Sequence, residues 1–338
     1  MMNAQQSYLR LLEPSESLIS EIKSIEGDIL MLGAGGKMGP SMAVLAREAI
    51  SKAGVKKEVI AVSRFSDPAA VGRIRASGAQ IINADLLDDD QLQRLPDVPN
   101  VIYLAGMKFG TTGKEPLTWA MNAYLPGRVA EKYKRSRIVV FSTGNVYPLV
   151  AVDSGGATER QPPGPVGEYA QSCLGRERIF QYFSSLHGNP VLIFRLNYAI
   201  DAYYGVLLDL AKSVMDGRPV DLRMGHVNVI WQGDANEFAI RSILHCTSPP
   251  KILNVTGSET LAVRDLASRF GEIFGVQPKF INDEQPTALL NNASESFRLF
   301  GKPRVTIDEM VSFVAAWLIE GGQTMNKPTH FQEREGQF

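Results

Sequence analysis

The chain has 338 residues, of which 44% are hydrophobic and 21% charged, and its formal net charge is −1. This length allows one large domain or two smaller ones. The near-neutral charge gives no electrostatic reason to expect nucleic acid or an anionic membrane as a partner, and no apolar run reaches the roughly 18 to 20 residues that cross a bilayer. Two cysteines and four scattered histidines predict neither a disulfide scaffold nor a metal site. Because the first residues lack a basic region followed by an apolar one, we expect a cytoplasmic protein.

The first part of the chain alternates short apolar runs with helical periodicity. An amphipathic stretch over 8–25 precedes an apolar run that ends in the glycines of GAGGKMG, and a helical pattern follows over 38–53. A long helix is expected over 115–135. Further strands are expected at EVIAVSRF, QIINADLL, NVIYLAG, RIVVFSTG and PVLIFRLNYAI. The alternation predicts an α/β fold with a Rossmann-type, doubly wound parallel sheet.

The pattern changes twice in the later part. Residues 148–167 are rich in Pro and Gly and predict a long ordered loop. After residue 201, helical and strand patterns mix, with KILNVTG as one strand, which predicts a smaller α/β lobe. We therefore expect three parts, namely a dinucleotide-binding Rossmann domain with a short N-terminal helix over 1–200, a substrate-binding lobe over 201–322 and a polar, extended tail over 323–338.

The glycine-rich turn after the first strand predicts a dinucleotide site. Gly33, Gly36 and Gly39 follow a G-x-x-G-x-x-G spacing, and Gly35 adds a further glycine. Glycines at a strand-to-helix turn let backbone N–H groups approach a pyrophosphate, and the helix N-terminus adds partial positive charge there. A plain turn can also contain glycine, but the strand, the helix and the position in the chain all agree with a cofactor loop.

The end of the second strand bears on the choice of cofactor. An acidic residue there would accept hydrogen bonds from the adenosine ribose, whereas this chain has Ser63 and Arg64. An arginine can hold a 2′-phosphate with two hydrogen bonds, which favours NADP over NAD. Asp85, at the end of the third strand, is placed to bind the adenine amino group.

These motifs carry a resemblance to a known family. The glycine loop, NAD with Asp85, YLAG with Gly106, Asn122, FSTGNVY and Tyr169 occur in the order found in extended short-chain dehydrogenases/reductases. The sequence resembles their NAD-dependent epimerase/dehydratase family, and FRLNYAID, ILNVTGSETLAVRDLA and FGKPRVTIDEMVSFVAAWL extend the resemblance over nearly the whole chain. LAGMK resembles the segment of UDP-galactose 4-epimerase whose lysine contacts the cofactor, which is Lys108 here.

The resemblance implies roles by position. Thr143 matches the residue that hydrogen-bonds the reacting hydroxyl, and Tyr169 matches the general acid/base that exchanges its proton while the nicotinamide takes the hydride. The implied cofactor-binding residues are Gly33, Gly36, Lys37, Met38, Gly39, Ser63, Arg64, Asp85, Leu86, Leu104, Ala105, Gly106, Lys108, Asn122, Tyr169 and Asn197. The implied substrate-binding residues are Thr143, Asn145, Tyr198, Arg223 and Trp231.

One departure from the family lies in the active site. The family has a lysine four residues after the tyrosine, which binds the nicotinamide ribose and lowers the pKa of the tyrosine; Cys173 stands there. A thiol supplies no cation, so Cys173 is either a small filler of the lysine's space or a specialised catalytic group. Arg176, Lys108 and the positive nicotinamide of the oxidised cofactor are the alternative sources of charge.

A second departure concerns the substrate. Nucleotide-sugar enzymes of the family carry an Arg-Asp pair that Val227 and Asn228 replace in GHVNVIWQGDA, and only Asp234 of the following motif remains. Arg223 is a possible substitute for the missing arginine. The loss favours a free sugar or sugar acid over a nucleotide sugar, with Trp231, Gln232, Asn228 and Tyr198 as suitable pocket residues. Trp231 is equally compatible with a place in the core.

Two functions remain open at this level. The first is an NAD(P)-dependent oxidoreductase or epimerase that acts on a sugar-like alcohol. The second is a catalytically impaired, NAD(P)-binding regulatory or scaffold protein, because the family lysine is missing. The resemblance also implies a homodimer formed through two long helices of the larger domain.

Overall fold

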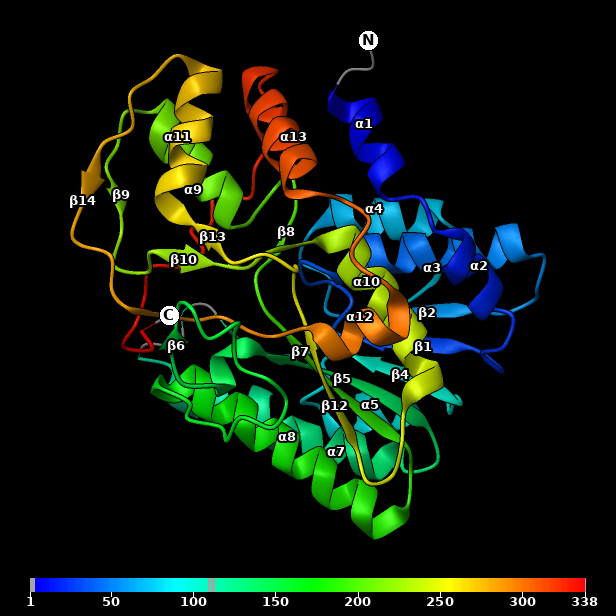
Figure 1. Ribbon diagram of the computed structural model, residues 1–338. Coiled ribbons are helices and arrows are strands. Elements are labelled where there is room, and N and C mark those ends of the chain that lie inside the picture. Colours follow the sequence, from blue (N-terminus) through cyan, green and yellow to red (C-terminus); the bar gives the residue numbers. More distant parts are fainter. Residues whose placement is uncertain (1–3, 109, 111–112, 338) are drawn as a thin grey trace.

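The computed structural model describes residues 4–108, 110 and 113–337. Its centre is a seven-stranded parallel sheet with the order β12-β7-β5-β4-β1-β2-β3 (Figure 1). The strands are β1 (Ile29–Leu32), β2 (Val59–Ser63), β3 (Gln80–Asn83), β4 (Asn100–Tyr103), β5 (Arg137–Thr143), β7 (Val191–Leu196) and β12 (Lys251–Val255). The strand order reverses between β1 and β4, and ligands of such sheets bind in the crevice at this reversal. The predicted doubly wound α/β fold is confirmed.

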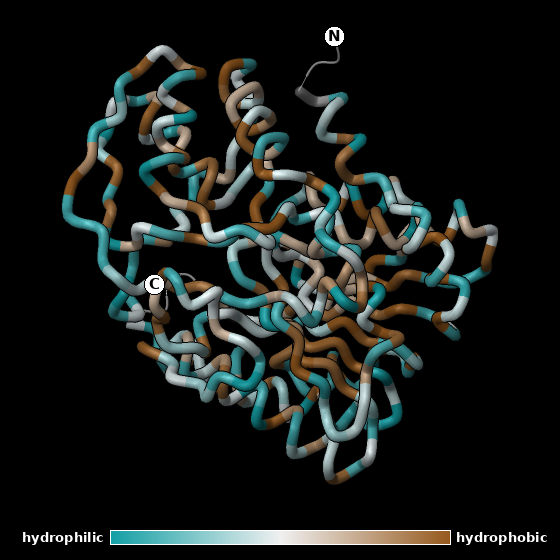
Figure 2. Tube along the Cα trace, in the orientation of Figure 1, coloured by the Kyte–Doolittle hydropathy of each residue, from teal (hydrophilic) through white to brown (hydrophobic). Residues whose placement is uncertain are grey.

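Side-chain alternation along the strands divides the core between the two faces of the sheet. On β1, Ile29 and Met31 join one buried cluster, whereas Leu30 and Leu32 join the other. Both faces are apolar because helices cover both, and Figure 2 shows the hydrophobic strands enclosed at the centre. The helices that contribute to the first cluster are α2 (Glu16–Glu21), α3 (Gly39–Ala53), α4 (Pro68–Ala76), α10 (Gln232–Arg241) and α12 (Ser294–Phe300). Those that contribute to the second are α5 (Asp89–Arg94), α7 (Leu125–Lys132) and α8 (Gly167–His187).

The helix predicted over 115–135 contains a change of helical type. It consists of α6 (Glu115–Trp119), a π-helical turn η1 (Ala120–Tyr124) and α7. The π-helical turn contains Asn122, whose side chain is fully buried. Such turns occur often at functional sites, and this one lies beside the segment that follows β4, because Asn122 bonds the backbone of Met107.

The smaller lobe has a core of its own, built by four helices and four short strand pairs (Figure 1). Its helices are α1 (Ala4–Leu11), α9 (Val206–Met215), α11 (Val263–Phe274) and α13 (Ile307–Ile319). The strand pairs are β6 (Val150–Ala151) with β15 (Thr287–Ala288), β8 (Ala199–Ile200) with β11 (Ile230–Trp231), β9 (Val220–Asp221) with β14 (Phe280–Ile281), and β10 (His226–Val227) with β13 (Leu261–Ala262). The described residues also include two single turns of 3-10 helix, η2 (Gly144–Val146) and η3 (Ser242–His245).

The chain passes between the two lobes more often than the sequence suggested. KILNVTG was expected in the smaller lobe, but β12 pairs with β7 along its whole length and forms an edge of the large sheet. In the opposite direction, α1 leaves the N-terminal domain and packs on α13 through Tyr8. Both placements correct the boundary expected at residue 200. The physical reason is that β12 satisfies the hydrogen bonds of β7, which would otherwise be an exposed edge.

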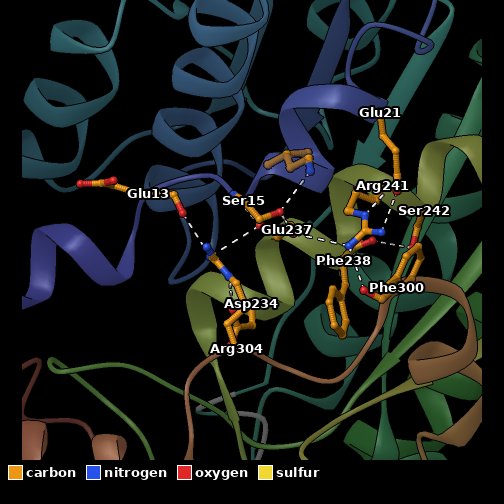
Figure 3. A network of polar contacts seen from close by, with 11 residues as sticks. Glu13, Ser15, Glu21, Asp234, Glu237, Phe238, Arg241, Ser242, Phe300 and Arg304 are labelled. Carbon is orange, nitrogen blue, oxygen red and sulfur yellow. Dashed lines mark hydrogen bonds and ion pairs between the residues drawn. The ribbon is translucent and has the colours of Figure 1, made fainter.

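A polar network ties the N-terminal segment to α10 and to the chain that precedes α13 (Figure 3). Glu237 accepts a 2.5 Å hydrogen bond from the Ser15 hydroxyl, and Arg241 donates to Glu21 at 2.7 and 2.9 Å. Asp234 accepts from the Val305 backbone at 3.0 Å and from Arg304 at 3.3 Å. Asp234, the one acidic residue retained from the nucleotide-sugar motif, therefore links α10 to the segment that precedes α13.

Candidate active site

The glycine loop joins β1 to α3 with room for a ligand's phosphates. Gly33 has φ +87°, and a Cβ there would lie 2.6 Å from the backbone N of Ala105. At Gly39 a Cβ would meet the backbone of Ala34. Gly36 differs, because the nearest atom to a Cβ is the Gly33 carbonyl oxygen at 3.5 Å and the other side is open. α3 starts without a side-chain cap, so its first N–H groups face this opening.

The residues expected to contact the adenosine side lie together at the ends of β2 and β3. Arg64 is 71% exposed and its Nη1 lies 3.6 Å from Asp85 Oδ2. Asp85 also accepts a hydrogen bond from the Leu87 backbone at 3.0 Å. Ser63 lies under Gly35, where its Oγ would be 2.7 Å from an added Cβ, and Leu86 is buried. An exposed ion pair of this kind contributes little stability, so Arg64 can turn to another anion at small cost.

Thr143, at the end of β5, and Tyr169, in the first turn of α8, meet side chain to side chain. Thr143 and Cys173 both lie within hydrogen-bonding reach of the Tyr169 hydroxyl, and the Thr143 hydroxyl donates to Asn145 Oδ1 at 2.9 Å. Burial and the neighbouring Cys173 hold the pKa of Tyr169 well above its usual range, while Arg176 and Thr143 act in the opposite direction. Cys173 is itself fully buried, and burial raises the pKa of its thiol. The cysteine therefore fills space beneath the tyrosine as a neutral group.

Arg176 reaches back along α8 into the space near Tyr169. Its Nη1 donates to the Phe141 carbonyl and its Nη2 to Asn122 Oδ1, each at 2.7 Å. A Cβ at residue 106 would collide with this guanidinium. The absence of a side chain at Gly106 therefore provides the space that Arg176 occupies. Arg176 is nevertheless near enough to Tyr169 to lower the pKa of its hydroxyl. Among the three charges proposed to replace the family lysine, Arg176 is the one that is buried and lies on the same helix as Tyr169.

Asn122 supports the site from beneath. Its oxygen accepts from the Met107 backbone and from Arg176, and its nitrogen donates to the Met107 carbonyl and to Ser172. These four bonds use the whole hydrogen-bonding capacity of the amide. Asn122 is buried with these protein partners, and its expected contact with the cofactor stays a prediction.

A cavity of about 230 Å³ lies over Thr143 and Tyr169. Two lysines line it from opposite elements. Lys37, in the glycine loop, donates to the Ala199 carbonyl at 2.6 Å and lies 4.0 Å above the ring of Tyr204, and Lys108 Nζ lies 5.9 Å from the ring centre of Tyr169. Burial lowers the pKa of Lys37 to about 7 and that of Lys108 to about 8. The other expected residues along the wall are Met38, Asn145, Asn197 and Tyr198.

Two residues expected at the substrate lie elsewhere. Trp231 is fully buried in the core of the smaller lobe, where its indole N–H donates to the Leu11 carbonyl at 3.1 Å. Arg223 is exposed and paired with Asp221 at 2.7 Å, and it does not line the cavity. Both expectations are corrected. Trp231 packs in the core of the smaller lobe, and Arg223 forms an ion pair with the neighbouring Asp221. Asn228 is buried too, and it accepts a hydrogen bond from Asn197.

Several wall residues were missed from the sequence. Tyr204, Gly205 and Val206 follow β8 and line the cavity, as does Thr329 from the far end of the chain. Ser142 also lines the cavity and donates to Glu177, which forms a buried ion pair with Arg195 at 2.6 Å. The aromatic-rich stretch after β8 was a usable signal for the first group. Nothing local marks Thr329, whose position depends on the path of the tail.

Among the described residues, no helix is long and apolar enough to cross a membrane, and no cluster of side chains could hold a metal ion.

Comparison with known proteins places the chain in a family. Residues 29–206, more than half of the chain, match the model of the NAD dependent epimerase/dehydratase family. No curated protein matches the sequence.

Three solved structures illustrate the structural likeness. A UDP-glucuronic acid 4-epimerase from Bacillus cereus, in complex with NAD, has a TM-score of 0.71 and 18% identity, over 87% of this chain and 99% of that one. A UDP-glucose 4-epimerase from Thermotoga maritima, with UDP-glucose, has a TM-score of 0.69 and 15% identity, over 87% and 99%. An epimerase from Methanothermobacter thermautotrophicus has a TM-score of 0.74 and 17% identity, over 90% and 96%. At these identities the likeness establishes the fold.

The family match confirms the resemblance drawn from the motifs and, with it, the expected class of enzyme. This chain belongs to the NAD dependent epimerase/dehydratase family.

Proposed function

We propose that the protein is an NAD(P)-dependent oxidoreductase or epimerase that acts on a hydroxyl of a small sugar-like molecule. The observation that carries the proposal is the contact between the Tyr169 and Thr143 hydroxyls in the wall of a cavity that also reaches the glycine loop through Lys37 and Met38. This arrangement supports one site for a nicotinamide and a secondary alcohol side by side.

A nicotinamide bound there would accept or return the hydride. Thr143 would orient the reacting hydroxyl, and the Tyr169 oxygen would take or give its proton. The difficulty is the raised pKa of Tyr169, since removing its proton in a buried place leaves a negative charge. Arg176 on one side and Lys108 on the other supply positive charge, and both act where water is largely excluded.

The two lysines favour a substrate with a negative group. Lys37 and Lys108 line the same cavity, and their like charges oppose each other, which contributes to the lowered pKa of Lys37. A carboxylate between them would relieve that repulsion. We therefore favour a sugar acid over a neutral free sugar, and a nucleotide sugar least.

NADP is the preferred cofactor in this proposal. The support is the exposed guanidinium of Arg64 at the end of β2, where the family's ribose-binding acid is absent. Asp85 partly neutralises this arginine at 3.6 Å, and a 2′-phosphate would have to compete with it. NAD remains the alternative, and the titration described next separates the two.

The test begins with calorimetric titration of the cofactor-free protein with NADPH, NADH and their oxidised forms. Tighter binding of the phosphorylated pair is expected. A screen of sugars and sugar acids by nicotinamide absorbance then uses wild type, Tyr169→Phe and Tyr182→Phe. Tyr182 is a matched control, because it is an exposed tyrosine of the same helix. Loss of turnover in Tyr169→Phe alone, with cofactor binding retained, supports the proposal.

A cofactor-binding protein without catalysis is the second candidate. It is favoured by the raised pKa of Tyr169 and by the neutral Cys173 in place of a lysine. It predicts binding of the dinucleotide with no turnover of any substrate in the screen. Binding of neither cofactor would contradict both candidates.

A homodimer through α7 and α8 forms part of the proposal. These helices pack side by side on the outer face of the sheet (Figure 1). Large apolar side chains are exposed on this helical layer, at Leu117, Trp119, Tyr124, Tyr182 and Leu186. Apolar groups gathered in this way are typical of an interface.

A further inference from the structure

The tail expected as an extended polar segment is docked across the cleft between the two lobes. We call residues 326–337 the C-terminal strap. In Figure 1 the chain's end lies between the smaller lobe and the layer formed by α8 and β6. The strap is irregular in backbone structure, so contacts with the rest of the molecule hold it in place.

Its first half is anchored in the smaller lobe. Thr329 donates from both its backbone N–H and its hydroxyl to Asp209 of α9, at 2.7 and 2.6 Å. Phe331 is 6% exposed and belongs to the core of that lobe. The Phe331 carbonyl also accepts a hydrogen bond from Tyr198, at 3.3 Å. Tyr198 and Thr329 both line the catalytic cavity, so this half of the strap forms part of its wall.

The second half first contacts the smaller lobe again, through Arg334, and then crosses to the other side of the cleft at Gly336. Arg334 donates to the Thr287 carbonyl and hydroxyl, each at 2.7 Å, and to the Arg223 carbonyl at 3.0 Å. Gly336 then approaches the backbone of Val166 and Gly167 so closely that a Cβ at either glycine would collide with the other segment. Val166 is the N-cap of α8 and Gly167 is its first residue, two positions before Tyr169. The strap therefore connects the substrate lobe to the helix that carries the catalytic tyrosine.

The space left under the strap is small. The cavity over Tyr169 has about 230 Å³, and the gap between Asn145, Tyr147 and the strap residues Glu333 and Arg334 has only about 30 Å³. Sites for drug-sized ligands span about 300 to 1,000 Å³. A nicotinamide that reaches Tyr169 would take part of the larger cavity, so the remaining volume suits a monosaccharide and not a nucleotide attached to one.

We infer that the C-terminal strap determines the size of the substrate: while docked it closes the cleft on the substrate side and excludes sugar substrates that carry a nucleotide. This inference rests on the proposed function for the class of substrate, a sugar acid. The strap also explains how a fold shared with enzymes solved with UDP-glucose or UDP-glucuronic acid could serve a smaller molecule.

The test uses two probes that differ only in the nucleotide, glucuronate and UDP-glucuronic acid, titrated calorimetrically into the protein saturated with its cofactor. Two strap variants are compared with wild type. The first is Arg334→Ala, and the second is a chain that ends at Phe331, which keeps the Asp209 bonds and the buried ring. Arg298→Ala is the matched control, because Arg298 is an exposed arginine paired with Glu295 outside the strap.

Wild type and the control are expected to bind glucuronate and to show no binding of UDP-glucuronic acid up to about 1 mM. Both strap variants are expected to gain affinity for UDP-glucuronic acid of at least about tenfold. Hydrogen exchange should show residues 332–337 protected in wild type and exposed in Arg334→Ala, which checks that this variant folds with the strap released.

Equal binding of UDP-glucuronic acid by wild type and both variants would overturn the inference, and so would its absence from all of them. Neither readout requires turnover. A gain of nucleotide-sugar affinity in the strap variants, with no response to glucuronate and no nicotinamide turnover, would support the strap's role and count against the proposed substrate alone.

Discussion

At the scale of single residues, the missing side chain at Gly106 makes room for the guanidinium of Arg176. The family's lysine position holds Cys173, and the guanidinium from the next helical turn enters the space that a side chain at residue 106 would take. The arginine is fixed by Phe141 and Asn122, so it cannot follow the substrate as a flexible lysine could. The positive charge near Tyr169 therefore comes from Arg176, whose hydrogen-bond partners are Phe141 and Asn122.

Restoring the family residue alone should therefore impair the protein. A lysine introduced by Cys173→Lys would be buried beside Arg176 and near Lys108, and the acid nearby, Glu177, is already paired with Arg195. We expect lower stability and at least about tenfold lower turnover. The double variant Cys173→Lys/Arg176→Leu should recover part of both.

Urea unfolding and nicotinamide absorbance measure the two effects in a double-mutant cycle. Additive losses in the double variant would contradict the coupling between positions 173 and 176. Cys246→Lys is not a suitable control, because Cys246 is itself half-buried. Cys173→Ala is preferable, since it removes the sulfur without adding charge.

The two cavity lysines predict a pH dependence of stability. The unfolded chain keeps its lysine protons to about pH 10, whereas burial lowers the folded pKa of Lys37 to about 7 and of Lys108 to about 8. Between these values the unfolded state binds more protons, so the free energy of unfolding should rise with pH through this window. Asp201 faces Lys37 and reduces the effect.

Thermal unfolding of the ligand-free protein between about pH 6.5 and 9.5 checks this expectation. Lys37→Met and Lys108→Met should each flatten the rise. An anionic substrate should bind more weakly as pH increases, because both lysines lose their charge. A stability that falls with pH in wild type, with no change in the variants, would refute the assignment.

At the scale of elements, the lobes are joined by α10 and its polar partners. Figure 3 shows Arg241 between Glu21 and Glu237. Removing one member of a buried ion pair leaves the others unpaired, so Arg241→Ala should lower the free energy of unfolding by about 3 kcal/mol. Arg298→Ala removes an exposed pair and should cost less than about 1 kcal/mol.

Chemical unfolding of the two variants gives the comparison, and titration with the cofactor shows whether the site is preserved. Affinity for the cofactor should be unchanged in both, because Arg241 lies outside the cavity. Equal losses of stability for the two variants would show that burial adds nothing at Arg241.

The elements themselves could largely be predicted from the sequence. The six strands expected in the large sheet are present, because apolar runs bounded by turns are local signals. β12 was recognised as a strand but assigned to the wrong lobe, since pairing partners are not encoded locally. Thr143 and Tyr169, named through the family resemblance, line one cavity, whereas Trp231 and Arg223 lie outside it.

At the scale of the whole molecule, the proposed dimer makes a direct prediction. Tyr124 and Tyr182 expose 59% and 62% of their surface on adjoining elements of the helical layer. Charges placed there by Tyr124→Glu/Tyr182→Glu should convert a dimer to a monomer, because like charges would face each other across a two-fold interface. Ile319→Glu is the control, since Ile319 is equally exposed but lies on α13 in the smaller lobe.

Size-exclusion chromatography with light scattering measures the mass of each variant. A wild-type monomer, or a dimer that survives the double substitution, would contradict an interface on this face. Retained cofactor binding in the monomer would show that each subunit holds a complete dinucleotide site.

The sequence by itself determined the parallel sheet and the glycine loop, because these depend on periodicity and on spacing along a few neighbouring residues, and Thr143 and Tyr169 followed from the family resemblance of their motifs. Only the tertiary structure decided where β12 pairs, that Arg176 enters the space beside Gly106, and that residues 326–337 cross the cleft. Each of these depends on contacts between residues far apart in the chain. Such contacts form through burial and shape, which no short stretch of sequence specifies.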